Sequence, residues 1–98
     1  MPYELSEKAA ADLDTIYEIG SERFGIRQAD RFFAELKEAL EFIGENPRLC
    51  HVRREYGDAI RIQVHQSHLI IYTTLDEAAL ILRIVHGHYD WQSDFTED

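Results

Sequence analysis

The chain has 98 residues, of which 45% are hydrophobic and 30% are charged, and its formal net charge is −9. This length predicts one domain over residues 1–98 with one modest core. No apolar run approaches the roughly 20 residues of a membrane span, and the N-terminal MPYELSEK has no secretory signal. We therefore expect a cytoplasmic protein with no membrane partner.

The first predicted elements are a short strand and two helices. Residues 3–5 (YEL) are expected to form the strand, and Ser6 is a good N-cap for a helix that ends at Gly25. Apolar or small residues recur with the helical period in this helix and in a second one, which Gly44 and Pro47 end. Because the connection is so short, the helices should be antiparallel neighbours.

The hydrophobic period then changes from 3.6 to 2. Segments 59–65, 68–74 and 79–86 are strand-like, with turns expected at 66–67 and 76–77. The pattern predicts an α+β fold, in which the N-terminal strand and the antiparallel helical hairpin pack on one face of an antiparallel β-meander. The side chains expected in the core are Leu13, Ile16, Phe32, Leu36, Leu40, Ile62, Leu82 and Ile84.

The connection between the second helix and the meander, GENPRLCHVRREYGD (residues 44–58), is long for so small a domain. Loops of this length are often functional. This one carries three arginines and a histidine, which are Arg48, Arg53, Arg54 and His51.

Charge is distributed unevenly along the chain. Residues 1–47 hold 5 basic and 11 acidic side chains, whereas residues 48–88 hold 5 basic and 4 acidic ones together with all five histidines. Because nucleic-acid binding depends largely on Lys and Arg meeting phosphates, we expect no direct nucleic-acid binding from a chain of this net charge. The later region is the part that an anion would approach.

The last predicted strand ends in titratable groups, in the sequence RIVHGHYD (residues 83–90). Ribonuclease chemistry needs a base for the 2′-hydroxyl, an acid for the leaving oxygen and cations for the phosphate. The candidates for this catalysis are Arg61, Arg83, His86, His88 and Tyr89. Arg61 and Arg83 lie opposite the main aliphatic sets of their strands, so both are expected on the open face of the sheet.

A structural interpretation of the same residues competes with the catalytic one. Arginines on an exposed sheet face often pair with surface carboxylates. His86 shares the parity of Leu82 and Ile84, which is typical of a core histidine. The sequence therefore assigns no residue to catalysis.

No metal or cofactor site is predicted. His86 and His88 are spaced as two strand ligands could be, but no third ligand is defined, and Cys50 is the only cysteine. There is also no Gly-rich phosphate loop and no nucleophile motif.

The order of these segments resembles the ParE/RelE superfamily of bacterial type II toxins, and most closely its ParE branch. The segments that carry the resemblance are YELSEKAAADLDTIYEIGSERFGIRQADRFFAEL, NPRL, IRIQVHQSHLIIYTT and ILRIVHGHYD. Together they cover nearly the whole chain. The last contains a closing Arg-x-x-His-x-x-x-Asp signature, formed here by Arg83, His86 and Asp90.

This resemblance implies a RelE/ParE-like toxin fold, neutralisation by a cognate antitoxin encoded beside the toxin, and a role in plasmid stabilisation. ParE-type toxins inhibit DNA gyrase by binding it, whereas RelE-type toxins cut mRNA in the ribosome with lysines and arginines of the sheet and loop. This chain has only Lys8 and Lys37, both in the predicted helices. Gyrase inhibition is therefore favoured over a metal-independent endoribonuclease activity.

Two alternatives stay open. His88-Tyr89 resembles the catalytic end of the YoeB ribonucleases, which makes a ribosome-dependent mRNA endonuclease the first, although their middle-strand arginine corresponds here to Leu69. The second is a non-toxic binding module of the same fold. The side chains expected to bind the antitoxin or the target are Arg48, Arg53, Arg54, Arg61 and Arg83.

Overall fold

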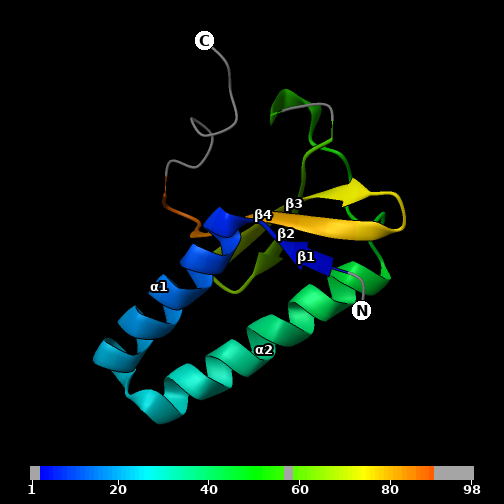
Figure 1. Ribbon diagram of the computed structural model, residues 1–98. Helices are drawn as coiled ribbons and strands as arrows, with labels where there is room; N and C mark the ends of the chain where they lie inside the picture. Colours follow the sequence, from blue (N-terminus) through cyan, green and yellow to red (C-terminus); the bar gives the residue numbers. More distant parts are fainter. Residues whose placement is uncertain (1–2, 57–58, 90–98) are drawn as a thin grey trace.

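The computed structural model describes residues 3–56 and 59–89, and this part of the chain folds into two helices and a four-stranded sheet (Figure 1). The elements in chain order are β1 (Tyr3–Leu5), α1 (Glu7–Phe24), α2 (Ile26–Glu45), a 3₁₀ turn (Arg54–Tyr56), β2 (Arg61–His65), β3 (His68–Leu75) and β4 (Ala78–His86). Both helices lie on one side of the sheet (Figure 1). The predicted α+β architecture is confirmed.

The strands follow the order β1-β4-β3-β2. β2, β3 and β4 form the expected antiparallel meander, with turns at 66–67 and 76–77. β1 adds to the sheet beside β4 in the parallel direction, with Leu5 opposite Ile81, so the complete sheet is mixed. The prediction that this strand packs with the helices on one face of the meander is therefore wrong, because β1 is an edge strand of the same sheet.

The helical hairpin starts and turns at the residues that its sequence indicated. The Ser6 hydroxyl accepts a hydrogen bond from the Ala9 amide (3.0 Å) and donates one to the Leu82 carbonyl oxygen (2.9 Å), so it caps α1 and attaches it to β4. Gly25 alone joins the helices, with a φ of 91° that favours glycine. In the described part of the chain, neither helix combines the length and apolarity needed to cross a membrane.

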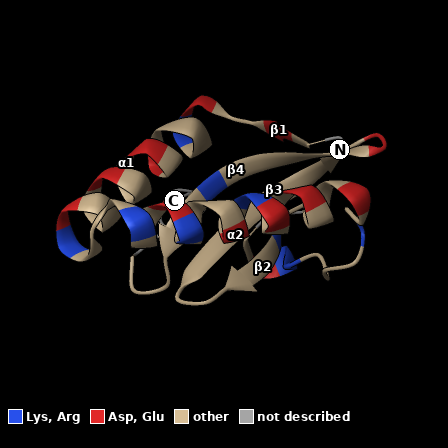
Figure 2. Cartoon of the chain, turned by 90° about the horizontal axis from the view of Figure 1, so that it is seen from below, with Lys and Arg blue, Asp and Glu red and all other residues tan. Residues whose placement is uncertain are grey.

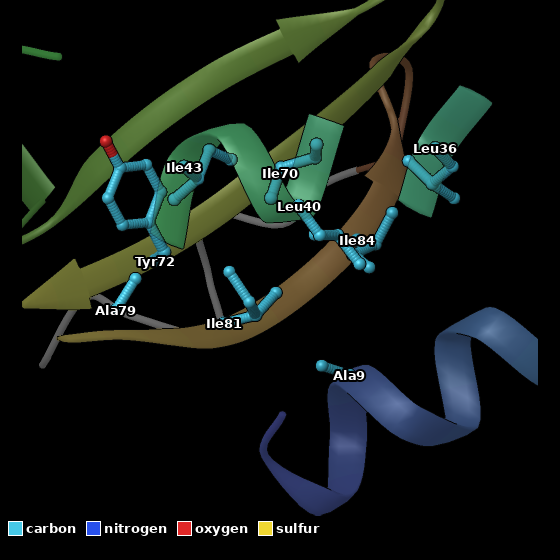
Figure 3. Close-up of a cluster of buried hydrophobic side chains, with 9 residues drawn as sticks. All are labelled: Ala9, Leu36, Leu40, Ile43, Ile70, Tyr72, Ala79, Ile81 and Ile84. Atoms are coloured by element: carbon cyan, nitrogen blue, oxygen red, sulfur yellow. The ribbon is translucent and has the colours of Figure 1, made fainter. Parts of the chain in front are cut away.

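The larger hydrophobic cluster lies between the helices and the sheet (Figure 3). Its buried members are Ala9, Leu36, Leu40, Ile43, Ile70, Tyr72, Ala79, Ile81 and Ile84. Leu36, Leu40 and Ile84 are at most 2% exposed, as predicted. Three more of the predicted core residues, Leu13, Ile16 and Phe32, are half-buried against this cluster.

Two predicted core residues, Ile62 and Leu82, lie elsewhere, and this part of the core prediction is wrong. Both are half-buried on a second, smaller cluster, whose buried members are Ile60, Ile71 and Val85. Ile62 pairs with Ile71 in the sheet, and directly paired residues share a face. The sheet therefore has apolar packing on both faces, not only under the helices.

A β-bulge in β4 explains the misplaced Leu82. Tyr72 pairs with Ile81, but the preceding Ile71 pairs with the residue two positions beyond Ile81 rather than one. Leu82 is therefore an extra residue that reverses the alternation of side chains along the strand. As a result, Ile81 and Ile84 both contribute to the cluster under the helices, although strict alternation would separate them.

Candidate functional site

The candidate residues fall into two regions of the molecule. The loop end consists of the connection 46–56 and the start of β2, and holds Arg48, Arg53, Arg54 and Arg61. The histidine end consists of the end of β2, the start of β3, the end of β4 and the turn after it, and holds His65, His68, His86, His88 and Tyr89. Arg83 lies on β4 close to the histidine end, so four of the five catalytic candidates gather there, without Arg61.

Arg61 fastens the loop end to the sheet. Its Nη1 donates to the carbonyl oxygens of Cys50 and Arg48, the latter at 3.4 Å. In the sheet it pairs with Tyr72, which belongs to the cluster under the helices, so the prediction that Arg61 lies on an open face is wrong. The reason is that α2 covers β3 and β4, while the loop covers the same face of β2.

Two further side chains hold this loop in place. The Cys50 thiol donates to the Gln63 side-chain oxygen (3.1 Å), and the Tyr72 hydroxyl donates to the Pro47 carbonyl oxygen (3.3 Å). Burial is the main cause that raises the pKa of Tyr72, so this hydroxyl stays a donor at physiological pH. Side-chain hydrogen bonds therefore tie the loop to both β2 and β3.

The remaining arginines of the loop end, Arg48, Arg53 and Arg54, form a basic loop patch. Arg53 pairs with Glu55 at 3.2 Å, and these side chains are 43% and 56% exposed. Arg48 and Arg54 are exposed, and Arg48 makes one long contact of 3.5 Å to the Asp76 carbonyl oxygen. Figure 2 shows basic positions beside the start of β2, while acidic positions follow both helices.

Arg83 is bound to α1. Its Nε and Nη2 donate to the two carboxylate oxygens of Asp12 at 2.8 and 3.0 Å, and both side chains are only 15% exposed. Asp12 also accepts the Ile84 amide at 2.9 Å, because β1 pairs with β4 only as far as Ile81 and leaves this edge without a strand partner. The prediction that Arg83 lies on an open face is therefore wrong.

The histidine end places aromatic rings in a continuous row. His65 pairs with His68, and His68 pairs with His86, so three neighbouring strands carry histidine at one level. The ring centroids of His68 and His86 are 5.5 Å apart, and those of His86 and His88 are 5.1 Å apart. His86 is exposed at the end of β4, so its prediction as a core histidine is wrong.

A cavity of about 640 Å³ opens between the helical hairpin and the histidine end. Aromatic rings from both sides line it, which are Tyr17, Phe24, Phe32, Phe33, His68, His86 and Tyr89. Phe32 lies 5.6 Å from the His65 ring and 5.4 Å from the His68 ring. Burial, followed by repulsion from His86 and His65, lowers the pKa of His68.

The arrangement supports proton transfer better than phosphate binding. His86 lines the cavity, the His88 ring stacks on His86, and the Arg83 guanidinium lies 5.6 Å from the centre of the Tyr89 ring. That guanidinium is however neutralised by Asp12. Asp90 of the expected signature lies outside the described residues. Within 3–56 and 59–89, no three His, Cys, Asp or Glu side chains are grouped to hold a metal ion.

Sequence reasoning missed the contributions of Asp12, Phe32 and the pair His65 and His68 to this region. The sequence VHQSH contained the signal for the histidine pair, because a two-residue turn at 66–67 makes the residues flanking it direct cross-strand neighbours. Nothing in the sequence pattern marked Asp12, whose partner is 71 residues away.

Comparisons with known proteins agree on one family. The model of the family described as ParE toxin of type II toxin-antitoxin system, parDE, matches residues 3–91. A protein named Toxin ParE1 from Caulobacter vibrioides is 32% identical over 85 residues, which are 87% of this chain and 88% of that protein. Toxin ParE1 from Mycobacterium tuberculosis is 29% identical over 89 residues, which are 90% of this chain and 91% of that protein.

A solved structure shares the fold. The structure titled "Chromosomal ParDE TA system from P. aeruginosa" contains a chain that superposes with a TM-score of 0.76 at 22% sequence identity. The match covers 88% of this chain and 95% of that one.

Proposed function

Because this chain belongs to the ParE toxin family of type II toxin–antitoxin systems, we propose that it inhibits DNA gyrase by binding it and that a cognate antitoxin neutralises it. Gyrase acts in the cytoplasm, so this is where the toxin would work. Inhibition by binding requires a surface complementary to gyrase and needs no cofactor. Family membership is the argument for a gyrase target, and the geometry of the histidine end supports it by disfavouring the ribonuclease alternative.

The observation that carries this preference is the Arg83–Asp12 pair. A ribonuclease needs a cation that can stabilise the extra negative charge of the phosphorane. Both carboxylate oxygens of Asp12 bind the Arg83 guanidinium. Arg61 lies on β2, on the far side of β3 from β4, and its guanidinium donates to two carbonyl oxygens of the loop. His88 and Tyr89 would therefore act without an arginine available to bind the phosphate.

The convergence of His86, His88 and Tyr89 is the observation that favours the alternative, a RelE/YoeB-like endonuclease. Neighbouring imidazole and phenol groups are suitable acids and bases. If cleavage were the activity, replacing one of these groups would reduce its rate by about 10²–10⁴-fold. The two functions therefore differ in their response to a single substitution, His88→Ala.

Two assays run side by side test the proposal. We expect the wild-type protein to inhibit supercoiling by purified gyrase, the antitoxin to reverse this, and ribosome-bound mRNA to stay intact in toeprinting. His88→Ala should still inhibit supercoiling. Cleavage in the ribosomal A site that disappears in His88→Ala, with supercoiling unaffected, would establish the endonuclease instead. Antitoxin binding without either activity would identify a non-toxic binding module.

A further inference from the structure

We propose that His65, His68, His86 and His88 form a pH-sensitive element, whose protonation loosens the ends of β2, β3 and β4 and opens the wall of the adjoining cavity. This inference concerns the folded chain itself and does not depend on gyrase inhibition. It rests on the placement of four titratable rings side by side, which neither the family description nor the relatives' names assign.

The geometry makes the charges of these rings mutually unfavourable. His68 lies between His65 and His86 across three strands, and the His88 ring stacks on His86 with an interplanar angle of 26°. Each imidazole becomes a cation when it is protonated. Two or more cations at these separations repel one another, and the repulsion acts on the strands that hold them.

Burial adds a second cost to protonation. The phenyl ring of Phe32 covers both His65 and His68. Nε2 of His65 and Nδ1 of His68 are buried without a hydrogen-bond partner among the described residues. On the side that faces α2, water does not hydrate these rings, and this desolvation disfavours the charged form of the imidazole.

The acidic groups of the neighbouring elements offset only part of the added positive charge. On α1, Asp12 is already bound to Arg83, and Arg23 lines the same cavity. On α2, Glu35 accepts from the Gln66 side chain, which stands in the turn between His65 and His68 (3.1 Å). Arg83 of β4 also lines the cavity, where Asp12 offsets its charge.

The direction of the pH dependence follows from the native environment of His68. Its pKa is lower in the folded chain than the ordinary value of 6.5, so the unfolded chain binds more protons. The contribution to stability is thus fully present above pH 6.5 and decreases as the pH falls toward the lower, native pKa. The range between about pH 7.5 and 5.5 lies on both sides of the ordinary histidine pKa of 6.5.

The experiment follows the unfolding midpoint of the full chain between pH 7.5 and 5.5. We expect the midpoint of the wild type to decrease as the pH is lowered from 7.5 to 5.5. The variant His68→Phe, which retains ring packing on Phe32, should remove about half or more of this decrease. His51→Gln is the matched control, because this exposed histidine lies in the loop outside the cluster, and it should keep the wild-type slope.

Measurements on the wild type make the test independent of how well the variant folds. The His68 ring resonances should titrate below pH 6.5, and the exchange protection of the Gly87 amide, which donates to the Ser67 carbonyl oxygen (2.8 Å), should decrease on acidification. A flat wild-type midpoint, a His68 titration at or above pH 6.5, or an unchanged slope in folded His68→Phe would overturn the proposal.

Discussion

Two arginine–carboxylate pairs in this molecule use the same chemical groups for different purposes. Arg83 and Asp12 are 71 residues apart in sequence, form two short hydrogen bonds and are 15% exposed. Arg53 and Glu55 are two residues apart, form one contact of 3.2 Å and are 43% and 56% exposed. A shielded, long-range pair can hold two elements together, whereas an exposed local pair leaves its arginine available to a partner.

The largest effect should come from breaking the shielded pair. Arg83→Ala would leave the Asp12 carboxylate without its counterion against β4, so we expect a loss of roughly 3–5 kcal/mol in the free energy of unfolding. Urea denaturation measures it. In a double-mutant cycle with Asp12→Asn, the two changes should be strongly non-additive. A loss of less than about 1 kcal/mol, the level of an ordinary surface substitution, would show that the pair does not anchor α1.

An intermediate effect is expected at the loop end. Arg61→Ala removes the donors to the Cys50 and Arg48 carbonyl oxygens, which should cost about 1–3 kcal/mol and increase amide exchange in the loop. Arg48→Ala is the matched control, because among the described residues its guanidinium makes one long contact of 3.5 Å, to the Asp76 carbonyl oxygen, and it should leave the unfolding midpoint unchanged. Equal effects of the two substitutions would contradict a tethering role for Arg61.

The smallest effect on stability, and the largest on partner binding, should come from the basic loop patch. The double variant Arg53→Glu with Arg54→Glu should keep the wild-type unfolding midpoint, because these side chains are accessible to solvent. If the patch meets acidic antitoxin side chains, its affinity for the product of the adjacent antitoxin gene, measured by calorimetry, should fall by at least about 10-fold.

The control for this double variant is Lys8→Glu with Lys37→Glu. It makes the same change in net charge at exposed positions on the two helices. It should bind the antitoxin nearly as the wild type does. Equal losses in both double variants would mean that net charge, rather than the patch, determines the affinity.

The histidine end shows which features of a site a local sequence pattern can predict and which it cannot. Arg83, His86, His88 and Tyr89 of RIVHGHYD lie near one another in the fold because they are close in sequence. The pattern did not indicate that Arg83 is neutralised, since the partner that decides this lies on α1. The bulge at Leu82 was also invisible, because an extra residue leaves the apolar composition of a strand unchanged.

The sequence by itself determined the elements of this protein. The change of hydrophobic period, the Ser6 cap and the Gly25 break are local features, and local features predict helices, strands and turns. Only the tertiary structure decided which elements meet. The parallel addition of β1 to β4, the Asp12–Arg83 pair and the Phe32–His68 contact join residues far apart in sequence. Their formation depends on the packing of the helical hairpin on the sheet, to which the whole chain contributes.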